Sequence, residues 1–285
     1  MKKLFRVIAV LTVVLSLFAC SSSNTPSEET GADKKIVVGC NPVPMVDILN
    51  AAKPVLEKDG YELEIVEFTD YVLPNTSLES GEIDANYFQT LGYMNDQNST
   101  NGLHLAAVGG VHIEPMGIYS QKVKDISELG EGSVVGVPND ADNEDRALQV
   151  LIAAGLLNDP HKNGYLDEND FNGNATTNPK GLVISPIEAA NLPNNLPDVD
   201  AAVINGNYAL GAGLPSTYPA IFVEVFDEET SIRRTNFIVV KEGNEASEKT
   251  QALVKAIQSD EVAKFIESNY KGSVIQSFLS QEDIK

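Results

Sequence analysis

Residues 134–157 read VVGVPNDADNEDRALQVLIAAGLL, and the order of residue types in this stretch decides the fold that we expect. Its first part, VVGVPN, is rich in β-branched side chains, which is typical of a short buried strand. From Asn143 to Leu157 the apolar side chains recur every three or four residues, as they do on one face of a helix. A strand that leads through a polar turn into a helix is the repeating half of a βαβ fold.

The same alternation of strand and helix signals continues on both sides of this stretch. Before it, KKIVVG (34–39) and LEIVEF (63–68) predict strands, and a helix that Pro44 opens and Gly60 ends lies between them. After it, segments such as NFIVV (236–240) again predict strands. We therefore predict an α/β protein with two lobes, in which each sheet carries helices on both faces and strands run between the lobes.

The beginning of the chain differs in kind from the rest. MKKLFR carries three positive charges, and the apolar run that follows it (7–18) has 12 residues, fewer than the roughly 20 that a membrane-spanning helix needs. This pattern predicts a secretory signal peptide over residues 1–19. The string LFAC resembles the lipobox of bacterial lipoproteins, so we predict that Cys20 is lipidated. An ordinary signal peptide with a fortuitous Cys is the alternative.

The remaining chain is divided by composition and by the expected elements. Residues 20–33 are polar and predict a flexible tether between the membrane and the folded body. We expect lobe 1 to comprise residues 34–120 and 226–285, and lobe 2 to comprise residues 121–225. No disulfide is expected, because Cys20 and Cys40 are the two cysteines and acylation of Cys20 competes with their pairing.

Charge and motif content exclude several classes of protein. The chain has 285 residues, with 20 Lys and Arg against 41 Asp and Glu, and its net charge of −21 repels phosphate backbones, so we expect no nucleic-acid partner. The three histidines are scattered, and no Walker A, GxSxG or GxGxxG string occurs. The loop 158–180 contains DENDFNGN, but Asn172 stands where an EF-hand needs Gly, so we predict a solvated loop. We expect no enzyme, no cofactor and no metal.

A binding site has better support. In PNDADNEDRAL (138–148) a strand ends and a helix begins, and open α/β sheets bind anions at such points on the free backbone N–H groups of the helix. Arg146 lies one turn into this helix, and its planar guanidinium suits a carboxylate, while Asn143 adds an amide donor. The alternative is that Arg146 only pairs with Glu144, Asp145 or another surface acid.

Several stretches, taken in order, resemble a known family. They are FTDYVLPN (68–75), DANYFQTLGYM (84–94), HIEPMGIYS (112–120), PNDADNEDRAL (138–148), NPKGL (178–182) and DVDAAVINGNYALGAGL (198–214). Together they are similar to the NlpA family of substrate-binding lipoproteins, the methionine-binding components of ABC importers. The resemblance implies a type 2-like periplasmic-binding-protein fold, with a cleft between two lobes that closes on a free amino acid. It also implies an ABC permease as partner and a lipid anchor at the outer face of the cell membrane.

The family's ligand residues are carried over by their position in these stretches and, for Asn236, in RTNFIVV (234–240). The resemblance implies that Arg146 and Asn143 hold the ligand carboxylate. It implies that Asn205 and Asn236 hydrogen-bond the α-amino and carboxyl groups of the ligand. These four side chains are expected to recognise the part that all free amino acids share.

The apolar part of the ligand is assigned in the same way to Tyr71, Phe88 and Tyr93, although packing in the core is the simpler role for each ring alone. Thr90 departs from the family, which has His after Phe-Gln, and its smaller side chain leaves room for a water or a longer ligand. We expect L-methionine first, and a methionine-containing dipeptide or another apolar amino acid second. Two hypotheses of a different class are a surface lipoprotein without a transport role and an enzyme that reuses the two-lobe fold.

Overall fold

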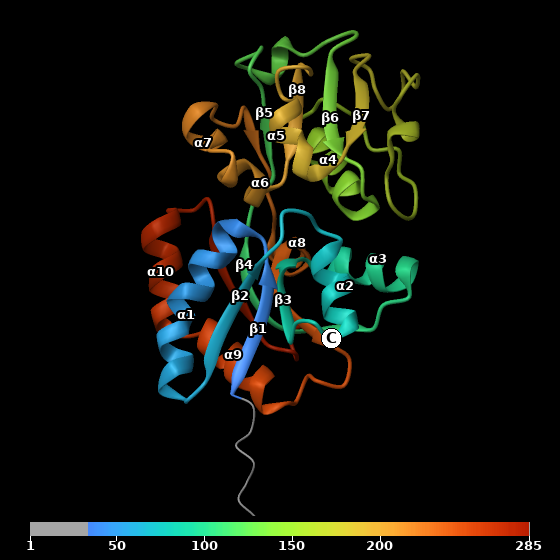
Figure 1. The fold of residues 1–285 in the computed structure, drawn as a ribbon. Coiled ribbons are helices and arrows are strands. Elements are labelled where there is room, and N and C mark those ends of the chain that lie inside the picture. The colour runs from blue at the N-terminus through green and yellow to red at the C-terminus, as the bar shows by residue number, and fades with distance from the viewer. Residues whose placement is uncertain (1–33, 285) are drawn as a thin grey trace, which may run out of the picture. The chain divides into compact units, whose positions relative to one another are not determined.

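The computed structural model describes residues 34–284, which contain two β-sheets (Figure 1). The expected signal peptide, the lipidation at Cys20 and the tether lie outside these residues. Within the described part, no helix has the length and apolar character needed to span a membrane.

The first sheet has the strand order β11-β4-β10-β3-β1-β2. β1 pairs in parallel with β2 and β3, whereas β10 is antiparallel to β3 and β4, and β11 is antiparallel to β4. The strands are β1 (Lys35–Cys40), β2 (Glu62–Glu67), β3 (Ala85–Gln89), β4 (Leu105–Ile113), β10 (Thr235–Lys241) and β11 (Ile275–Leu279). The helices are α1 (Asp47–Lys58), α2 (Leu73–Ser80), α3 (Leu91–Asn101), α9 (Glu248–Ile257) and α10 (Asp260–Tyr270).

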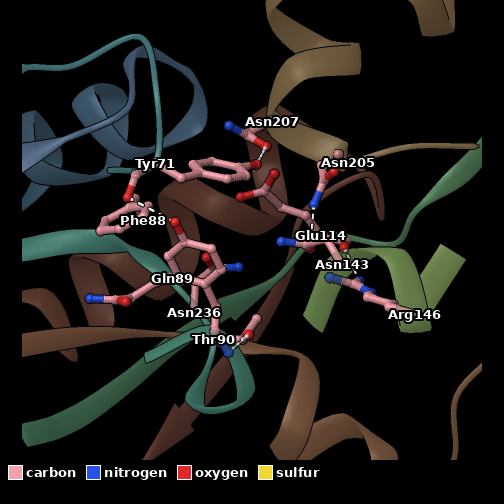
Figure 2. A pocket seen from close by; sticks show the side chains of 12 residues that line it. Tyr71, Phe88, Gln89, Thr90, Glu114, Asn143, Arg146, Asn205, Asn207 and Asn236 are labelled. Atoms are coloured by element: carbon pink, nitrogen blue, oxygen red, sulfur yellow. Dashed lines mark hydrogen bonds between the residues drawn. The ribbon is translucent and has the colours of Figure 1, made fainter. Parts of the chain in front are cut away.

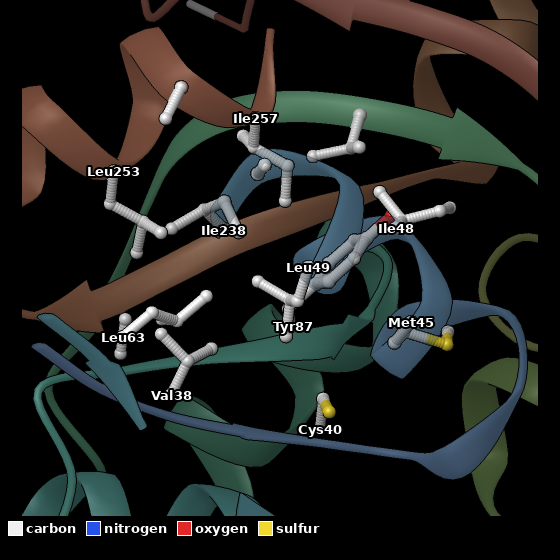
Figure 3. Packing of buried hydrophobic residues seen from close by; sticks show 14 of the residues in the cluster. Val38, Cys40, Met45, Ile48, Leu49, Leu63, Tyr87, Ile238, Leu253 and Ile257 are labelled. Carbon is white, nitrogen blue, oxygen red and sulfur yellow. The ribbon is translucent and has the colours of Figure 1, made fainter. Parts of the chain in front are cut away.

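Helices cover both faces of this sheet, with α1, α9 and α10 on one side and α2 and α3 on the other (Figure 1). α1 packs against the first sheet because its apolar side chains recur at helical spacing. Ile48, Leu49, Ala52 and Leu56 are all buried. In Figure 3, side chains of α1 meet those of β1, β10 and α9 in one cluster. The predicted helix between Pro44 and Gly60 is confirmed.

The second sheet has the order β7-β6-β8-β5-β9, with β6 parallel to β7 and β8 and with β5 antiparallel to β8 and β9. Its strands are β5 (Gly117–Tyr119), β6 (Val134–Pro138), β7 (Val183–Ile187), β8 (Ala201–Ile204) and β9 (Phe222–Val223). α4 (Ala141–Ala153) packs on one face, while α5 (Leu192–Asn195), α6 (Gly206–Gly211) and α7 (Leu214–Thr217) contribute to a second cluster. Short helical turns occupy Pro42–Val46, Ile126–Glu128, Glu168–Asp170 and Ala189–Asn191.

The chain passes between the two sheets twice. The first crossover, residues 114–116, joins β4 to β5, and the second, residues 224–234, joins β9 to β10 and contains α8 (Glu228–Arg234). The second sheet therefore begins at Gly117, inside the range that we expected for lobe 1. Below, lobe 1 means the first sheet with its helices, and lobe 2 means the second sheet with its helices.

The loop 158–180 is only partly the solvated loop that its composition predicts. Phe171 is fully buried and packs with Leu148 and Leu151 of α4, although polar residues surround it in the sequence. Asn172 also pairs with the edge of β7, where it hydrogen-bonds both backbone groups of Ile184 at 2.9 Å. Leu166, Thr177 and Asn178 are also buried, so Phe171 is the largest of a few side chains that anchor a loop whose other residues are mostly exposed.

Replacing Phe171 with alanine is expected to lower the free energy of unfolding by about 3–5 kcal/mol, because a buried ring is lost and a cavity remains. Denaturant unfolding followed by circular dichroism measures this change. Tyr165 offers a matched control in the same loop, since it is 39% exposed and its replacement by alanine is expected to cost less than about 1 kcal/mol. Equal effects at the two positions would contradict the anchoring role of Phe171.

Candidate ligand-binding site

A cavity lies between the two lobes, with an empty volume of about 370 Å³. Its lining comes from both lobes and from the first crossover (Figure 2): Tyr71, Phe88, Gln89, Thr90, Tyr93, Glu114, Asn143, Arg146, Asn205, Gly206, Asn207 and Asn236. The structure thus brings together all eight side chains that the sequence assigned to one site, together with four residues that it did not.

Several of these residues lie where parallel strands end at their carboxyl edge. Phe88 is on β3, Thr90 follows it, and Arg146 is on α4, the helix after β6. Asn205 follows β8 and is the N-cap residue of α6. Loops at the carboxyl ends of parallel strands are where open α/β sheets bind ligands, so the fold places the cavity at its expected edge.

Arg146 does not pair with the neighbouring acids on its own helix. Its Nε donates to both oxygens of Glu224, at 3.0 and 3.2 Å, and its Nη2 donates to Oε2 of Glu224 at 2.5 Å and to the carbonyl of Glu114 at 2.8 Å. A pair with Glu144 or Asp145 is therefore wrong, but Arg146 does pair with another acid, Glu224, whose side chain is buried and not on the surface. Burial disfavours the charged guanidinium, but the adjacent Glu224 carboxylate raises the pKa of Arg146 above its usual value.

One edge of the Arg146 guanidinium is therefore occupied by the protein itself, although the sequence predicts that the whole planar group is available to a ligand. Only Nη1 has no hydrogen bond to the described residues, and Arg146 lines the cavity. The guanidinium is thus held in one orientation by Glu224 while one nitrogen stays available for an anion.

Asn143 and Asn205 form a pair that leaves one acceptor without a partner. Nδ2 of Asn205 donates to Oδ1 of Asn143 at 2.7 Å, and Nδ2 of Asn143 donates to Oδ1 of Asp140 at 2.9 Å. Oδ1 of Asn205 is buried without any hydrogen-bond partner among the described residues. Leaving a buried acceptor unsatisfied costs about 1–3 kcal/mol, so this atom is a candidate for contact with a donor of the ligand. Burial also raises the pKa of Asp140 to about 6.

Glu114 is a buried carboxylate in the first crossover that sequence reasoning did not single out. It is 4% exposed, and its Oε1 is hydrogen-bonded to Nε2 of His112 at 2.5 Å, while Nδ1 of His112 contacts the hydroxyl of Tyr87. No described residue hydrogen-bonds its Oε2. A Cβ built on Gly206 would lie 2.6 Å from Cβ of Glu114, so a glycine is needed where α6 approaches this residue. Glu114 belongs to HIEPMGIYS, one of the stretches that resemble the family, but nothing in that stretch showed that its side chain faces a cavity.

The three aromatic side chains assigned to the site pack against one another. The ring centroid of Tyr71 lies 5.6 Å from that of Phe88 and 5.7 Å from that of Tyr93, and the centroids of Phe88 and Tyr93 lie 5.9 Å apart. The hydroxyl of Tyr71 donates to Oδ1 of Asn207 at 2.6 Å, and that of Tyr93 donates to the carbonyl of Tyr71 at 3.1 Å. Because the hydroxyls are occupied, the rings offer apolar faces and edges to the cavity.

Thr90, the position that departs from the family, forms a contact between the lobes. Its Oγ1 accepts from the backbone N–H of Tyr93 at 3.4 Å, which caps α3, and it donates to Oδ2 of Asp142 on α4 at 3.4 Å. Asp142 also packs against Gly92, where a Cβ would lie 2.8 Å from the Asp142 Cγ. Burial raises the pKa of Asp142, although Arg234 and Arg146 oppose this shift. The wider pocket expected from a small residue at position 90 is thus partly closed by lobe 2.

The comparison with protein families agrees with this arrangement. The model of the NlpA lipoprotein family matches residues 36–278. The chain belongs to the NlpA lipoprotein family. The α/β fold with two lobes and a cavity between them, which that family resemblance implied, is confirmed.

Individual members of the NlpA family are similar over most of their length. The chain is 39% identical over 230 residues to the D-methionine-binding lipoprotein MetQ of Escherichia coli, which covers 80% of this chain and 82% of that protein. It is 35% identical over 247 residues to the membrane lipoprotein TpN32 of Treponema pallidum, covering 87% of this chain and 90% of that protein. A solved structure of a nutrient-binding protein from Burkholderia cenocepacia bound to methionine has a TM-score of 0.75 and 37% identity, covering 85% of this chain and all of that one.

Proposed function

We propose that this protein is an extracytoplasmic lipoprotein that captures L-methionine between its lobes and delivers it to an ABC permease. The observation that carries the proposal is the set of free polar atoms around one small cavity. Arg146 offers Nη1 as a donor, while Asn205 and Glu114 offer Oδ1 and Oε2 as acceptors. A free amino acid is a zwitterion, so its carboxylate and ammonium match a donor and two acceptors in one cavity.

Different residues would then bind the carboxylate and the ammonium of the ligand. Arg146 would hold the carboxylate through Nη1, and Asn143 keeps one amide hydrogen for it besides the one that it donates to Asp140. Asn205 and Glu114 would receive the ammonium, and Asn236 on β10, which also lines the cavity, would bond either group. Glu114 is therefore added to the ligand residues that the sequence suggested.

The apolar end of the ligand would lie against Tyr71, Phe88 and Tyr93. A thioether is polarisable and gains about 0.3–1.5 kcal/mol from each contact with an aromatic ring. A relative from Escherichia coli is named for D-methionine binding and a structure from Burkholderia cenocepacia is described as bound to methionine, which supports methionine as the ligand. The same relatives are named for binding and not for catalysis, so we assign no reaction to the cavity.

Capture requires both lobes. Tyr71, Phe88 and Tyr93 belong to lobe 1, while Asn143 and Arg146 belong to lobe 2, so only a closed arrangement completes the site. A ligand that bridges both lobes favours closure through contacts that the open form lacks. The permease would recognise the closed form. Lipidation at Cys20 would hold the protein at the outer face of the membrane, and stable anchoring needs more than one lipid chain or a second membrane signal.

A thermal-shift panel on ligand-stripped protein tests the proposal. It contains L-methionine, D-methionine, glycyl-methionine, leucine and glutamine. A ligand at 100 times its Kd is expected to stabilise the protein by about 2.7 kcal/mol, which is visible as a rise in Tm. A shift with L-methionine supports the proposal. A shift only with glycyl-methionine or leucine keeps the binding role and changes the ligand, and no shift with any of them contradicts it.

Changing Gly92 to alanine is expected to weaken methionine binding at least tenfold, because the new Cβ collides with Asp142 and holds the lobes apart. Calorimetric titration measures the Kd. Gly211→Ala is the matched control, since a Cβ there meets nothing within 4 Å. An unchanged Kd for Gly92→Ala would show that the contact between α3 and α4 is not needed for binding.

A further inference from the structure

Glu224 lies in the second crossover and does not line the cavity. Its side chain is nevertheless buried, only 7% exposed, and both of its carboxylate oxygens are occupied. Oε1 accepts from Nε of Arg146 at 3.0 Å and lies 3.1 Å from Nε of Arg234. Oε2 accepts from Nη2 of Arg146 at 2.5 Å and from the backbone N–H of Met116 at 3.0 Å.

These contacts join the two crossovers at one point. Met116 lies in the first crossover, and besides donating to the Glu224 side chain it accepts from the Glu224 backbone N–H at 2.8 Å. Arg146 adds a third link, because its Nη2 donates to the carbonyl of Glu114 in the same crossover. Both chain segments that join the lobes are thus tied to one carboxylate.

The same carboxylate fixes the direction of Arg146. Two parallel N–H donors on one carboxylate define the plane of the guanidinium, which leaves Nη1 on the opposite side. Arg234, on the other side of Glu224, ends α8 directly before β10, the strand that carries Asn236 of the cavity. Glu224 therefore lies between a residue assigned to the ligand and the segment that leads back into lobe 1.

We infer that Glu224 is a positioning residue for ligand capture: it orients Arg146 toward the ligand carboxylate and ties that orientation to the crossovers between the lobes. The part that concerns the ligand rests on the proposed function, whereas the tie between the crossovers does not. A neutral glutamine keeps the shape of Glu224 but turns an NH₂ group toward donors, so it cannot hold both Arg146 and Met116 in the same way.

The experiment compares Glu224→Gln with Glu242→Gln in the complete protein. Glu242 is an exposed residue at which the same chemical change is expected to alter the Kd by less than about twofold. For Glu224→Gln we expect methionine affinity to fall about 10–100-fold, by analogy with the loss of metal affinity when a residue that orients a metal-binding side chain is replaced. Unfolding melts establish that each variant is folded.

A second background separates positioning from general damage. In Arg146→Lys protein there is no planar group for Glu224 to orient, so Glu224→Gln is expected to lower affinity by less than about twofold further. If Glu224→Gln lowered methionine affinity by the same factor in the wild-type and the Arg146→Lys protein, the inference would be overturned, because Glu224 would then act independently of Arg146.

Hydrogen exchange tests the tie between the crossovers without any ligand. Glu224→Gln is expected to speed amide exchange of Met116 in ligand-free protein, as followed by NMR, and Glu242→Gln is not. Unchanged exchange at Met116 would overturn this part of the inference. If the wild-type protein bound no amino acid while Met116 lost protection in Glu224→Gln, the proposed function would fail and the structural tie would stand.

Discussion

Arg146→Ala is expected to weaken methionine binding by about 2–5 kcal/mol, the usual cost of removing one partner from a buried, hydrogen-bonded charge pair. Arg146 is 4% exposed, and Nη1 is the nitrogen through which it would reach the ligand carboxylate. Without it, the carboxylate would enter a cavity that also contains the buried acid Glu114. A large loss is therefore expected even if the aromatic contacts survive.

Two further variants define the cause of this loss. Arg233 is exposed, so Arg233→Ala removes the same charge from the surface and is expected to leave the Kd nearly unchanged. Arg146→Lys keeps the charge but not the planar group, and an intermediate affinity is expected. Calorimetric titration of the folded variants gives the Kd values. An affinity of Arg146→Ala equal to that of the wild type would remove Arg146 from the site.

Glu114→Gln is expected to weaken methionine binding by about 1.5–3 kcal/mol, the contribution of a hydrogen bond to a charged group. The change keeps the size of the side chain and leaves an oxygen for His112, but it removes the negative charge opposite the ligand ammonium. Loss of charge complementarity, and not loss of packing, would then cause the effect. Glu242→Gln is again the matched control, because that residue is exposed.

The ligand itself provides a sharper test of this role. 4-(Methylsulfanyl)butanoate is methionine without its amino group, and it leaves Glu114 without a cationic partner. We expect the wild-type protein to bind it more weakly than methionine, and Glu114→Gln to bind it no worse than the wild type does. If the variant lost affinity equally for both ligands, Glu114 would not be the residue that receives the ammonium.

Much of the fold followed from local pattern. The apolar spacing of 143–157 and the β-branched run before it predicted β6 and α4, and the same reasoning predicted α1 between Pro44 and Gly60. Such elements can be predicted from sequence because burial of one face makes apolar residues recur at a regular spacing. The burial of Phe171 could not be predicted in this way, since a single buried ring in a polar loop produces no regular spacing of apolar residues.

The candidate site was likewise predicted from sequence only in part. Motif position led to all eight of the predicted residues that line the cavity, and the strand-to-helix turn at 138–148 pointed independently to Arg146 and Asn143. The roles of Glu114 and Glu224 emerged only from the folded chain. Glu224 is 78 positions from Arg146 in sequence, yet it occupies the edge of the guanidinium that the sequence assigned to the ligand. Local sequence specifies which side chains are present and on which element, whereas hydrogen bonds between distant segments decide which of their atoms remain free to bind.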